Sequence, residues 1–347
     1  MREAMLYEKL TGSRVQCHVC QWRCVVQPGQ FGVCRVRHNQ DGVLRILNYA
    51  QISSAAVDPI EKKPLFHFYP TSFVFSLGGW GCNFHCEHCQ NWEISMASLA
   101  GGIPGSRQIS PQEAIEAAKR YSCSGIAWTY NEPAIWHEYT LDSAKLARQE
   151  NLYTVYVTNG YITEEALDSI GPYLDAYRVD VKGFTDSFYR NLCKVSKWQG
   201  ILDIAARAQE KWDMHVEVVT NIIPTMNDDD AQLEALATWI RDNLGEMTPW
   251  HVTRFHPYYH LQHLYSTPVE TLERAYNIGK KVGLRFIYVG NVPGHKSENT
   301  ICYNCGNTAI KRWGYHTQLV GLDGSNCKFC GANLNITRTP RTLGQRS

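Results

Sequence analysis

The sequence predicts an α/β fold: a parallel sheet wound as a partial (βα)6 barrel, with a small cysteine-rich segment before it and a ribbon-like module after it. From Phe73 onward, short runs rich in β-branched and aromatic residues alternate with helical stretches. Repeated βα units require parallel strands joined by right-handed crossovers, and about six units suffice for the partial barrel. A doubly wound open sheet is the alternative. The expected strands are residues 73–77, 125–130, 153–158, 177–182, 215–223, 250–256 and 285–289.

Length and composition limit the class of protein. The chain has 347 residues, 44% of them hydrophobic, which is enough for one large domain with small appendages. A net charge of +1 gives no pointer to nucleic acid or to a membrane surface. No apolar run approaches the roughly 18 residues of a membrane span, and residues 1–10 are charged, so we expect a cytoplasmic protein without membrane contact.

The chain divides into four expected parts. Residues 1–71 form a cysteine-rich metal-binding segment and a connector, residues 72–296 the barrel, residues 297–331 a four-cysteine ribbon, and residues 332–347 a polar tail expected to be disordered. The chain has thirteen cysteines, and eleven of them stand in groups with metal-ligand spacings, which in a chain of this size indicates metal sites in a reducing compartment rather than disulfides.

The first cysteine group has the spacing C-x2-C-x3-C-x9-C. Four ligands make a closed set for zinc or for an iron–sulfur cluster, and a metal would stabilise a segment too short to bury much core. Buried or redox cysteines without a metal are the alternative, and the spacing does not decide between zinc and iron–sulfur. The four residues are Cys17, Cys20, Cys24 and Cys34.

Several helix starts carry recognisable caps. Ser110 and Thr267 are each followed by a proline and, at the third position, by a glutamate, a pattern typical of a capping residue before a first helical turn. Thr163 and Asn227 stand before two further helical stretches.

Three cysteines after the first expected strand have the spacing C-x3-C-x2-C: Cys82, Cys86 and Cys89. They follow the pair Gly78-Gly79, which favours a tight loop around a metal centre. Three thiolates are one short of a closed site, and an open position is where a metal does chemistry on a ligand. A structural metal knuckle is the alternative.

This motif resembles the signature of the radical S-adenosylmethionine (SAM) superfamily. The resemblance implies a 4Fe-4S cluster on Cys82, Cys86 and Cys89, with SAM on the fourth iron, inside a partial (βα)6 radical SAM barrel. It also implies reductive cleavage of SAM to a 5′-deoxyadenosyl radical, which abstracts a hydrogen atom from a substrate. His88 occupies the place of a residue that is usually aromatic and lies near the adenine.

Polar residues at the ends of the expected strands fit a working face there. Asn131 and Glu132 resemble in position the motif that binds the SAM amino nitrogen, although its glycine pair is absent, and Thr158-Asn159 resembles a cofactor-contacting sequence of glycyl-radical activating enzymes. The resemblance further places Asn221 to Ile223 near the adenine and His256 near the ribose or carboxylate of SAM. A packed core histidine is the alternative for His256.

Arg178, Asp180 and Lys182 alternate with valines, so period-two geometry places the three charges on one face of a strand. Charges on a buried strand need partners or a ligand. A mutually satisfied ion pair such as Asp180–Lys182 is the alternative to contact with SAM or substrate.

The C-terminal module has two Cys-x-x-Cys-Gly knuckles, typical of a zinc ribbon, with iron as the minority alternative. The module also carries three basic residues, Lys311, Arg312 and Lys328, which suggest nucleic-acid binding. A solvated basic face is the favoured interpretation of these residues. Cys123 and Cys193 are isolated and are expected to be structural. The four ligands are Cys302, Cys305, Cys327 and Cys330.

The order of these motifs, together with Asp58-Pro-Ile-Glu-Lys-Lys-Pro-Leu and Arg254-Phe-His-Pro, resembles the AmmeMemoRadiSam-system radical SAM enzymes over nearly the whole chain. That family is similar to pyruvate formate-lyase activating enzyme. The resemblance implies an anaerobic oxidoreductase, a one-electron donor such as flavodoxin or ferredoxin, and association with Memo-type and AMMECR-type proteins. It does not imply the substrate. A polypeptide is the first hypothesis, RNA or a small molecule the second, and a non-catalytic metal-stapled scaffold the third.

Overall fold

The computed structural model describes residues 1–99, 101–102, 105 and 107–338. One eight-stranded sheet forms the centre, in the order β16-β15-β14-β13-β12-β11-β9-β8. Seven neighbouring strands run parallel, and β8 pairs antiparallel with β9. The parallel sheet is confirmed, and its strand order follows the chain without the reversal that a doubly wound sheet shows. The strands are β8 (Ser54–Pro59), β9 (Phe73–Gly78), β11 (Gly125–Trp128), β12 (Tyr153–Thr158), β13 (Ala176–Asp180), β14 (His215–Ile222), β15 (Trp250–Arg254) and β16 (Ile287–Gly290).

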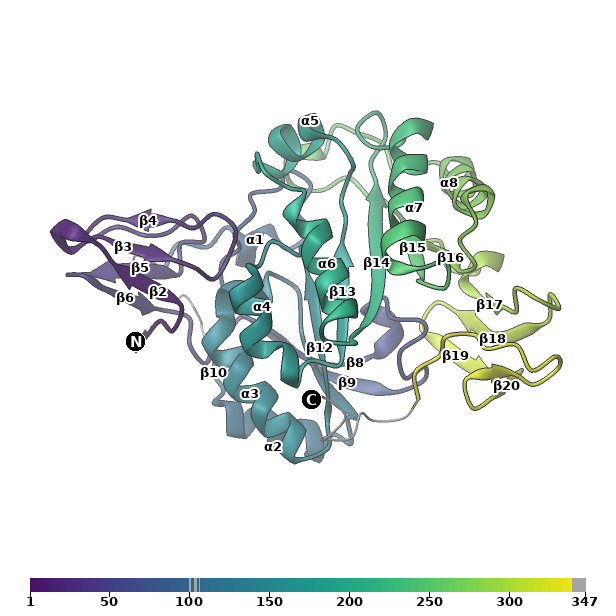
Figure 1. Cartoon of the computed structure of the whole chain (residues 1–347), viewed down its shortest axis with the longest axis horizontal. Coiled ribbons are helices and arrows are strands. Elements are labelled where there is room, and N and C mark those ends of the chain that lie inside the picture. Colours follow the sequence, from purple (N-terminus) through teal and green to yellow (C-terminus); the bar gives the residue numbers. More distant parts are fainter. Residues whose placement is uncertain (100, 103–104, 106, 339–347) are drawn as a thin grey trace.

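The helices between these strands cover one face of the sheet (Figure 1). They pack through small and apolar residues, as α2 does with Ala114, Ile115 and Ala118. No helix in the described ranges is long and apolar enough to cross a membrane. The helices are α1 (Trp92–Ser95), α2 (Pro111–Arg120), α3 (His137–Gln149), α4 (Glu164–Ile170), α5 (Asp186–Phe188), α6 (Gly200–Glu210), α7 (Asp230–Leu244) and α8 (Val269–Val282), with a π-helix at Tyr189–Cys193.

Two of the four expected helix caps are confirmed. Ser110 forms a reciprocal capping box with Glu113, and Thr163 accepts from the amide of Ala166. The other two expectations are wrong. The hydroxyl of Thr267 donates to the carbonyl of Ile222 at 2.5 Å, and Asp229 rather than Asn227 caps α7. The side chains of both residues instead hydrogen-bond to buried backbone groups at neighbouring strands, and local sequence does not reveal such contacts.

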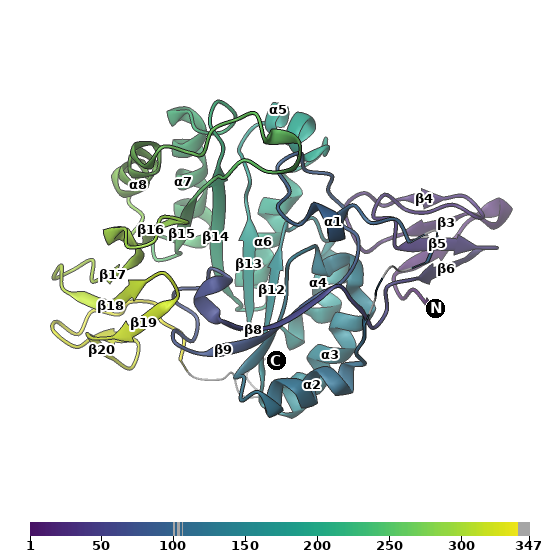
Figure 2. The same ribbon diagram turned by 180° about the vertical axis from the view of Figure 1, so that it is seen from behind.

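The opposite face of the sheet carries the connector that follows β8 (Figure 2). Ile60, Leu65 and Phe68 form an apolar cluster with Ala127 and Val155 of the central strands. The connector therefore closes the sheet's second face, while the cysteine loop after β9 stays at the carboxyl ends of the strands.

The N-terminal segment forms two three-stranded sheets that project from one side of the central sheet (Figure 1). Its attachment includes Arg37, which is buried and pairs in bidentate fashion with Glu138 of α3 at 3.0 and 2.7 Å. The strands are β1 (Arg2–Glu3), β6 (Val43–Ile46) and β5 (Arg37–Gln40) in one sheet, and β2 (Tyr7–Lys9), β3 (Val15–Cys17) and β4 (Val25–Val26) in the other. A further pair joins β7 (Gln51–Ile52) to β10 (Arg107–Gln108).

The C-terminal module lies at the other side, beside β16 (Figure 1). It consists of β17 (Thr300–Ile301), β18 (Thr308–Trp313), β19 (His316–Leu319), β20 (Leu322–Asp323) and β21 (Asn326–Cys327). The expectation that disorder begins at residue 332 is wrong for residues 332–338. Leu334 and Ile336 are buried in the module, and Thr337 forms a bridge with Phe68. Residues 339–347 of the expected tail lie outside the described residues.

Candidate active site

The cysteine loop begins at the carboxyl end of β9, and the side chain of Asn131 fixes its shape. Asn131 accepts from the amide of Gly79 at 3.1 Å and donates to the carbonyl of Gly81 at 2.8 Å. Gly81 has a φ of +84°, and a Cβ there would lie 2.7 Å from the carbonyl oxygen of Cys34. Only glycine allows this turn and this close approach. Cys82 is thereby placed against the N-terminal segment.

Several donors surround the three sulfurs. The amide of Phe84 and the side chain of Asn159 approach the Cys82 sulfur at 3.4 and 3.8 Å. Ser95 hydrogen-bonds to Cys89, and the thiol of Cys193 hydrogen-bonds to Cys86. Burial raises the pKa of Cys82 and of Cys89, and these donors oppose that shift because they favour the thiolate, which is the metal-binding form.

The spacing of the sulfurs is informative. Among the described residues, only the C-terminal cysteines bring three or more ligand atoms within 4.8 Å of one another. Cys82, Cys86 and Cys89 are therefore spread more widely than ligands of one tetrahedral metal, whose sulfurs lie about 3.8 Å apart. A cluster that places each cysteine on a different iron fits this spread.

Arg178, Asp180 and Lys182 do lie on one face, as period two predicts. Asp180 accepts from Arg178 at 2.5 Å and from Lys182 at 3.0 Å, so the ion-pair alternative is present in the structure. Burial opposes the charge on Lys182, but Asp180, Cys86 and Cys193 together raise its pKa. Lys182 is thus a fixed cation beside the cysteine loop, suited to offset thiolate charge.

Glu132 is almost fully buried and organises the neighbouring strand ends. It accepts from Thr158 at 2.7 Å and from the amide of Asn159 at 2.8 Å. The side chain of Asn159 in turn donates to Asn83 in the cysteine loop at 2.8 Å. Burial raises the pKa of Glu132 to about 7. The structure therefore brings Asn131, Glu132, Thr158 and Asn159 together around Cys82.

Four other candidate residues lie farther along the same edge. His88 is buried, and burial, followed by the charge of Lys182, lowers its pKa to about 3, so the ring is neutral. Its Nδ1 has no hydrogen-bond partner among the described residues. Asn221 donates to Thr253 on β15, and Ile223 is fully buried. His256 is exposed rather than packed in the core.

A sequence profile of the radical SAM superfamily matches residues 79–239, which include the cysteine loop and the strand ends around it. The chain belongs to the radical SAM superfamily. It is 44% identical over 338 residues to an uncharacterized protein of Methanocaldococcus jannaschii, covering 97% of this chain and 99% of that protein. It is 24% identical over 188 residues to the pyruvate formate-lyase-activating enzyme of Clostridium pasteurianum (51% and 75%). It is 22% identical over 230 residues to the pyruvate formate-lyase 1-activating enzyme of Escherichia coli K12 (60% and 89%).

Two residues of this candidate site were not identified from the sequence. Cys193 was expected to be structural, yet its thiol contacts Cys86, and its carbonyl accepts from His85 at 3.3 Å. The π-helix that ends at Cys193 holds the cysteine loop from the side, and π-helices often mark functional sites. Asn83 bridges Asn159 to the loop. No spacing rule identifies either residue, because each acts across a distance of many residues in sequence.

The C-terminal ligands have the geometry of a single tetrahedral metal. Cys302 lies 3.6 Å from Cys330, and Cys305 lies 3.7 Å from Cys327, measured between sulfurs. Sulfurs about 2.3 Å from one zinc would lie about 3.8 Å apart. The group can hold zinc or another tetrahedral ion.

Arg312 does not belong to a basic surface, which corrects the sequence-based grouping with Lys311 and Lys328. It is buried, donates to the carbonyl of Phe66 at 2.7 Å and to Thr300 at 2.8 Å, and stacks 4.2 Å from the Phe66 ring. Arg312 therefore attaches the ribbon to the connector. Because it is buried, only Lys311 and Lys328 remain of the three basic residues considered for RNA contact.

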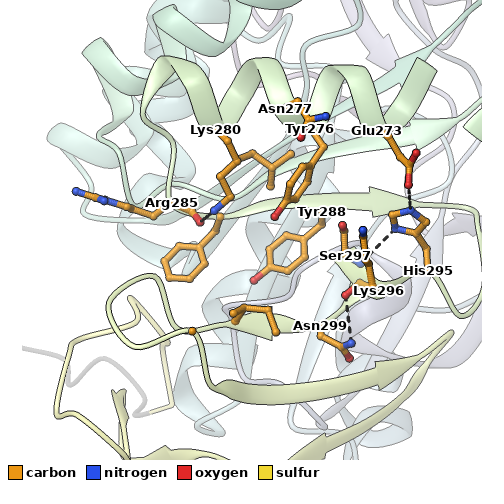
Figure 3. A pocket seen from close by; sticks show the side chains of 14 residues that line it. Glu273, Tyr276, Asn277, Lys280, Arg285, Tyr288, His295, Lys296, Ser297 and Asn299 are labelled. Carbon is orange, nitrogen blue, oxygen red and sulfur yellow. Dashed lines mark hydrogen bonds and ion pairs between the residues drawn. The ribbon is translucent and has the colours of Figure 1, made fainter. Parts of the chain in front are cut away.

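A separate pocket of about 590 Å³ lies between α8, β16 and the start of the ribbon (Figure 3). Lys280 and Lys296 approach it from opposite sides, and His295 lies 3.3 Å from Glu273 at its rim. None of the candidate SAM or cluster residues lines it.

Proposed function

We propose that the chain is a radical SAM enzyme in which Cys82, Cys86 and Cys89 hold a 4Fe-4S cluster on a partial (βα)6 barrel. The observation that carries the proposal is that these three cysteines lie in the loop at the carboxyl end of a parallel strand, next to the fixed cation of Lys182, without forming the close ligand group that a single metal ion requires. When bound, the cluster and SAM supply the chemistry: one electron cleaves SAM, and the resulting 5′-deoxyadenosyl radical abstracts hydrogen from a substrate.

The protein's own residues would position SAM and exclude water. Asn131 and Glu132 fix the loop and the strand end where the amino acid part of SAM would bind. His88 offers a neutral, planar ring whose Nδ1 is free for adenine. Asn221, Ile223 and His256 are the remaining candidates along this edge.

A polypeptide is the substrate class that we propose. The relatives named as activating enzymes act on pyruvate formate-lyase, by their names. The loops around the cysteine motif also expose aromatic side chains, which are typical anchors in protein interfaces. Trp92 stacks on Tyr259 at 5.0 Å, and Tyr258 and Tyr265 are exposed on the same loop after β15.

The order of the motifs along the sequence supports the finer parts of the proposal. Similarity of motif order supports an AmmeMemoRadiSam-system enzyme working with Memo-type and AMMECR-type proteins, in the cytoplasm, with a flavodoxin or ferredoxin as electron donor. Zinc is the proposed ion at the C-terminal four cysteines.

The test is anaerobic. Protein reconstituted with iron and sulfide is given SAM and dithionite, and 5′-deoxyadenosine is measured by chromatography. Wild-type protein should form it, and Cys86→Ala should not. Cys123→Ala, which removes a buried thiol on the helical side of the sheet, should retain it. Equal product from Cys86→Ala and wild type would refute the proposal.

The substrate class is tested with host-cell extract added to the same reaction. Stimulation of 5′-deoxyadenosine formation that protease treatment abolishes would support a polypeptide. Stimulation that only ribonuclease abolishes, or that passes a small-molecule filter, would contradict the polypeptide and indicate RNA or a metabolite.

A further inference from the structure

The four N-terminal cysteines, three of them buried, converge on a small cavity. The cavity is small and is otherwise lined by Val19, Gly32, Arg37 and Ile135. A water in such a cavity would need two to four polar partners, and apart from Arg37 the lining offers only apolar side chains and sulfurs. The ligand chemistry that suits this cavity is thiophilic metal. The four residues are Cys17, Cys20, Cys24 and Cys34.

The spacing of these thiols separates one metal ion from a cluster. In the ribbon the sulfur pairs lie 3.6 and 3.7 Å apart, as one tetrahedral ion requires. Within the described part of the chain, no three N-terminal sulfurs lie within 4.8 Å of one another. The N-terminal set therefore shares the wide spacing of Cys82, Cys86 and Cys89, where each ligand would bind a different iron.

Arg37 supplies charge to the same cavity. It is buried, its terminal nitrogens bind Glu138, and its Nε has no hydrogen-bond partner among the described residues. A buried polar atom without a partner is costly, and a sulfur ligand set of net negative charge would satisfy it. Backbone amides of Trp22, Val33 and Val36 also hydrogen-bond to the sulfurs of this set. Hydrogen bonds from amides to the sulfurs help to set the reduction potential of an iron–sulfur cluster.

We propose that Cys17, Cys20, Cys24 and Cys34 hold a second 4Fe-4S cluster, which passes electrons to the cluster at Cys82, Cys86 and Cys89. Assignment of the second cluster stands on its own geometry, whereas the relay rests on the proposed function. The two cysteine segments lie against each other, because the backbone carbonyl of Cys34 lies 2.7 Å from where a Cβ on Gly81, the residue before Cys82, would be.

Aromatic residues bridge the same two sets. Trp22 lies between Cys20 and Cys24 in sequence, and its indole donates to the carbonyl of Asn83 at 2.8 Å. Its ring lies 6.0 Å from Tyr161, which lies 5.3 Å from Phe84 in the cysteine loop. In the relay, a one-electron protein donor is oxidised, the N-terminal cluster is reduced, and the electron then moves to the second cluster. No bond forms or breaks in this transfer.

The site is tested by metal analysis of the full chain purified anaerobically. Cys82→Ala/Cys86→Ala/Cys89→Ala should retain about four irons and four sulfides per chain, with about one zinc. About two zincs and no iron would overturn the proposal. If this variant is insoluble, the wild-type protein decides: about eight irons and one zinc support the second cluster, and about four irons and two zincs refute it.

The relay is tested with two reductants. A variant with Cys17, Cys20, Cys24 and Cys34 replaced by alanine should form 5′-deoxyadenosine with dithionite, which reaches the site directly. With flavodoxin and its reductase it should form at least about tenfold less than wild type. Equal rates with flavodoxin would overturn the relay. Absence of product from the wild-type protein with dithionite would instead refute the proposed function and leave the iron count of the second cluster standing.

Discussion

Two four-cysteine modules at opposite sides of the sheet use the same ligand type in different ways. The ribbon is built from two matching knuckles, in which the amides of Gly306 and Gly331 return to Cys302 and Cys327 at 2.9 and 2.8 Å. Its sulfurs are close together, and two of them are exposed. The N-terminal set has no repeat, does not form such a close group of sulfurs, and lies against the cysteine loop after β9. Composition alone therefore does not define a metal site, because the backbone sets the distance between sulfurs.

The largest expected effect is loss of the ribbon itself. Cys327→Ser should lower zinc from about one per chain to near zero and unfold the module, since a structural zinc contributes roughly 10–16 kcal/mol of apparent binding energy in small finger peptides. Elemental analysis and limited proteolysis measure both effects. Cys34→Ser is the matched variant and should lower iron while leaving zinc unchanged. Loss of zinc from Cys34→Ser would contradict the assignment of zinc to the ribbon and iron to the N-terminal set.

The attachments of the two modules should also differ. Arg37→Met leaves the carboxylate of Glu138 buried without its partner, so we expect a loss of about 3–5 kcal/mol in unfolding free energy. Arg312→Met breaks hydrogen bonds to neutral oxygens and should cost about 1.5–3 kcal/mol. Urea denaturation measures both. Arg37→Met/Glu138→Leu should recover most of the first loss, and no recovery would contradict the ion-pair explanation.

Acid should weaken the ribbon side of the molecule. Burial lowers the pKa of His67 to about 3, and its Nε2 lies 2.5 Å from the hydroxyl of Tyr288 beneath the ribbon. The unfolded chain binds a proton near pH 6.5 that the folded chain does not, so stability is full above pH 6.5 and falls progressively toward pH 3. Between pH 7 and pH 5 the loss is about 2 kcal/mol.

Urea denaturation at several pH values checks this slope. His67→Gln should reduce the loss between pH 7 and pH 5 by about 2 kcal/mol, because other buried histidines such as His88 contribute the remainder, whereas His316→Gln, at an exposed position of β19, should leave it unchanged. An unchanged slope in His67→Gln would assign the acid sensitivity to other groups.

The smallest expected effect lies away from both modules. Ser110→Ala removes the capping box of α2 and should lower unfolding free energy by about 1 kcal/mol, with iron and zinc contents unchanged. Thermal unfolding and elemental analysis check the two parts. A change in either metal would indicate that global destabilisation, rather than ligand loss, governs metal content in the cysteine variants.

Local and periodic features were predictable from sequence. All seven expected strands lie on strands of the sheet, because burial and β-branched residues coincide there. The capping box at Ser110 depends on residues three apart. Arg178, Asp180 and Lys182 share a face because strand geometry has period two.

Features that depend on distant partners were not predictable. Arg312 is buried because Phe66 and Thr300 accept its hydrogen bonds, and Phe66 lies far away in sequence. The hydroxyl of Thr267 donates to the carbonyl of Ile222 on a neighbouring strand and does not cap α8. Cys193 reaches Cys86 only through the π-helix. Each of these roles follows from tertiary contacts that no local pattern encodes.

The most direct test of the central claim is electron paramagnetic resonance of the dithionite-reduced protein with and without SAM. In the proposed cluster, Cys82, Cys86 and Cys89 would leave one iron without a protein ligand, so SAM should shift the spectrum of that cluster in the wild-type protein and in Cys123→Ala. The shift should be absent from Cys86→Ala. A reduced cluster spectrum that is the same with and without SAM would contradict the account, because it would show that no iron in the protein is open to SAM.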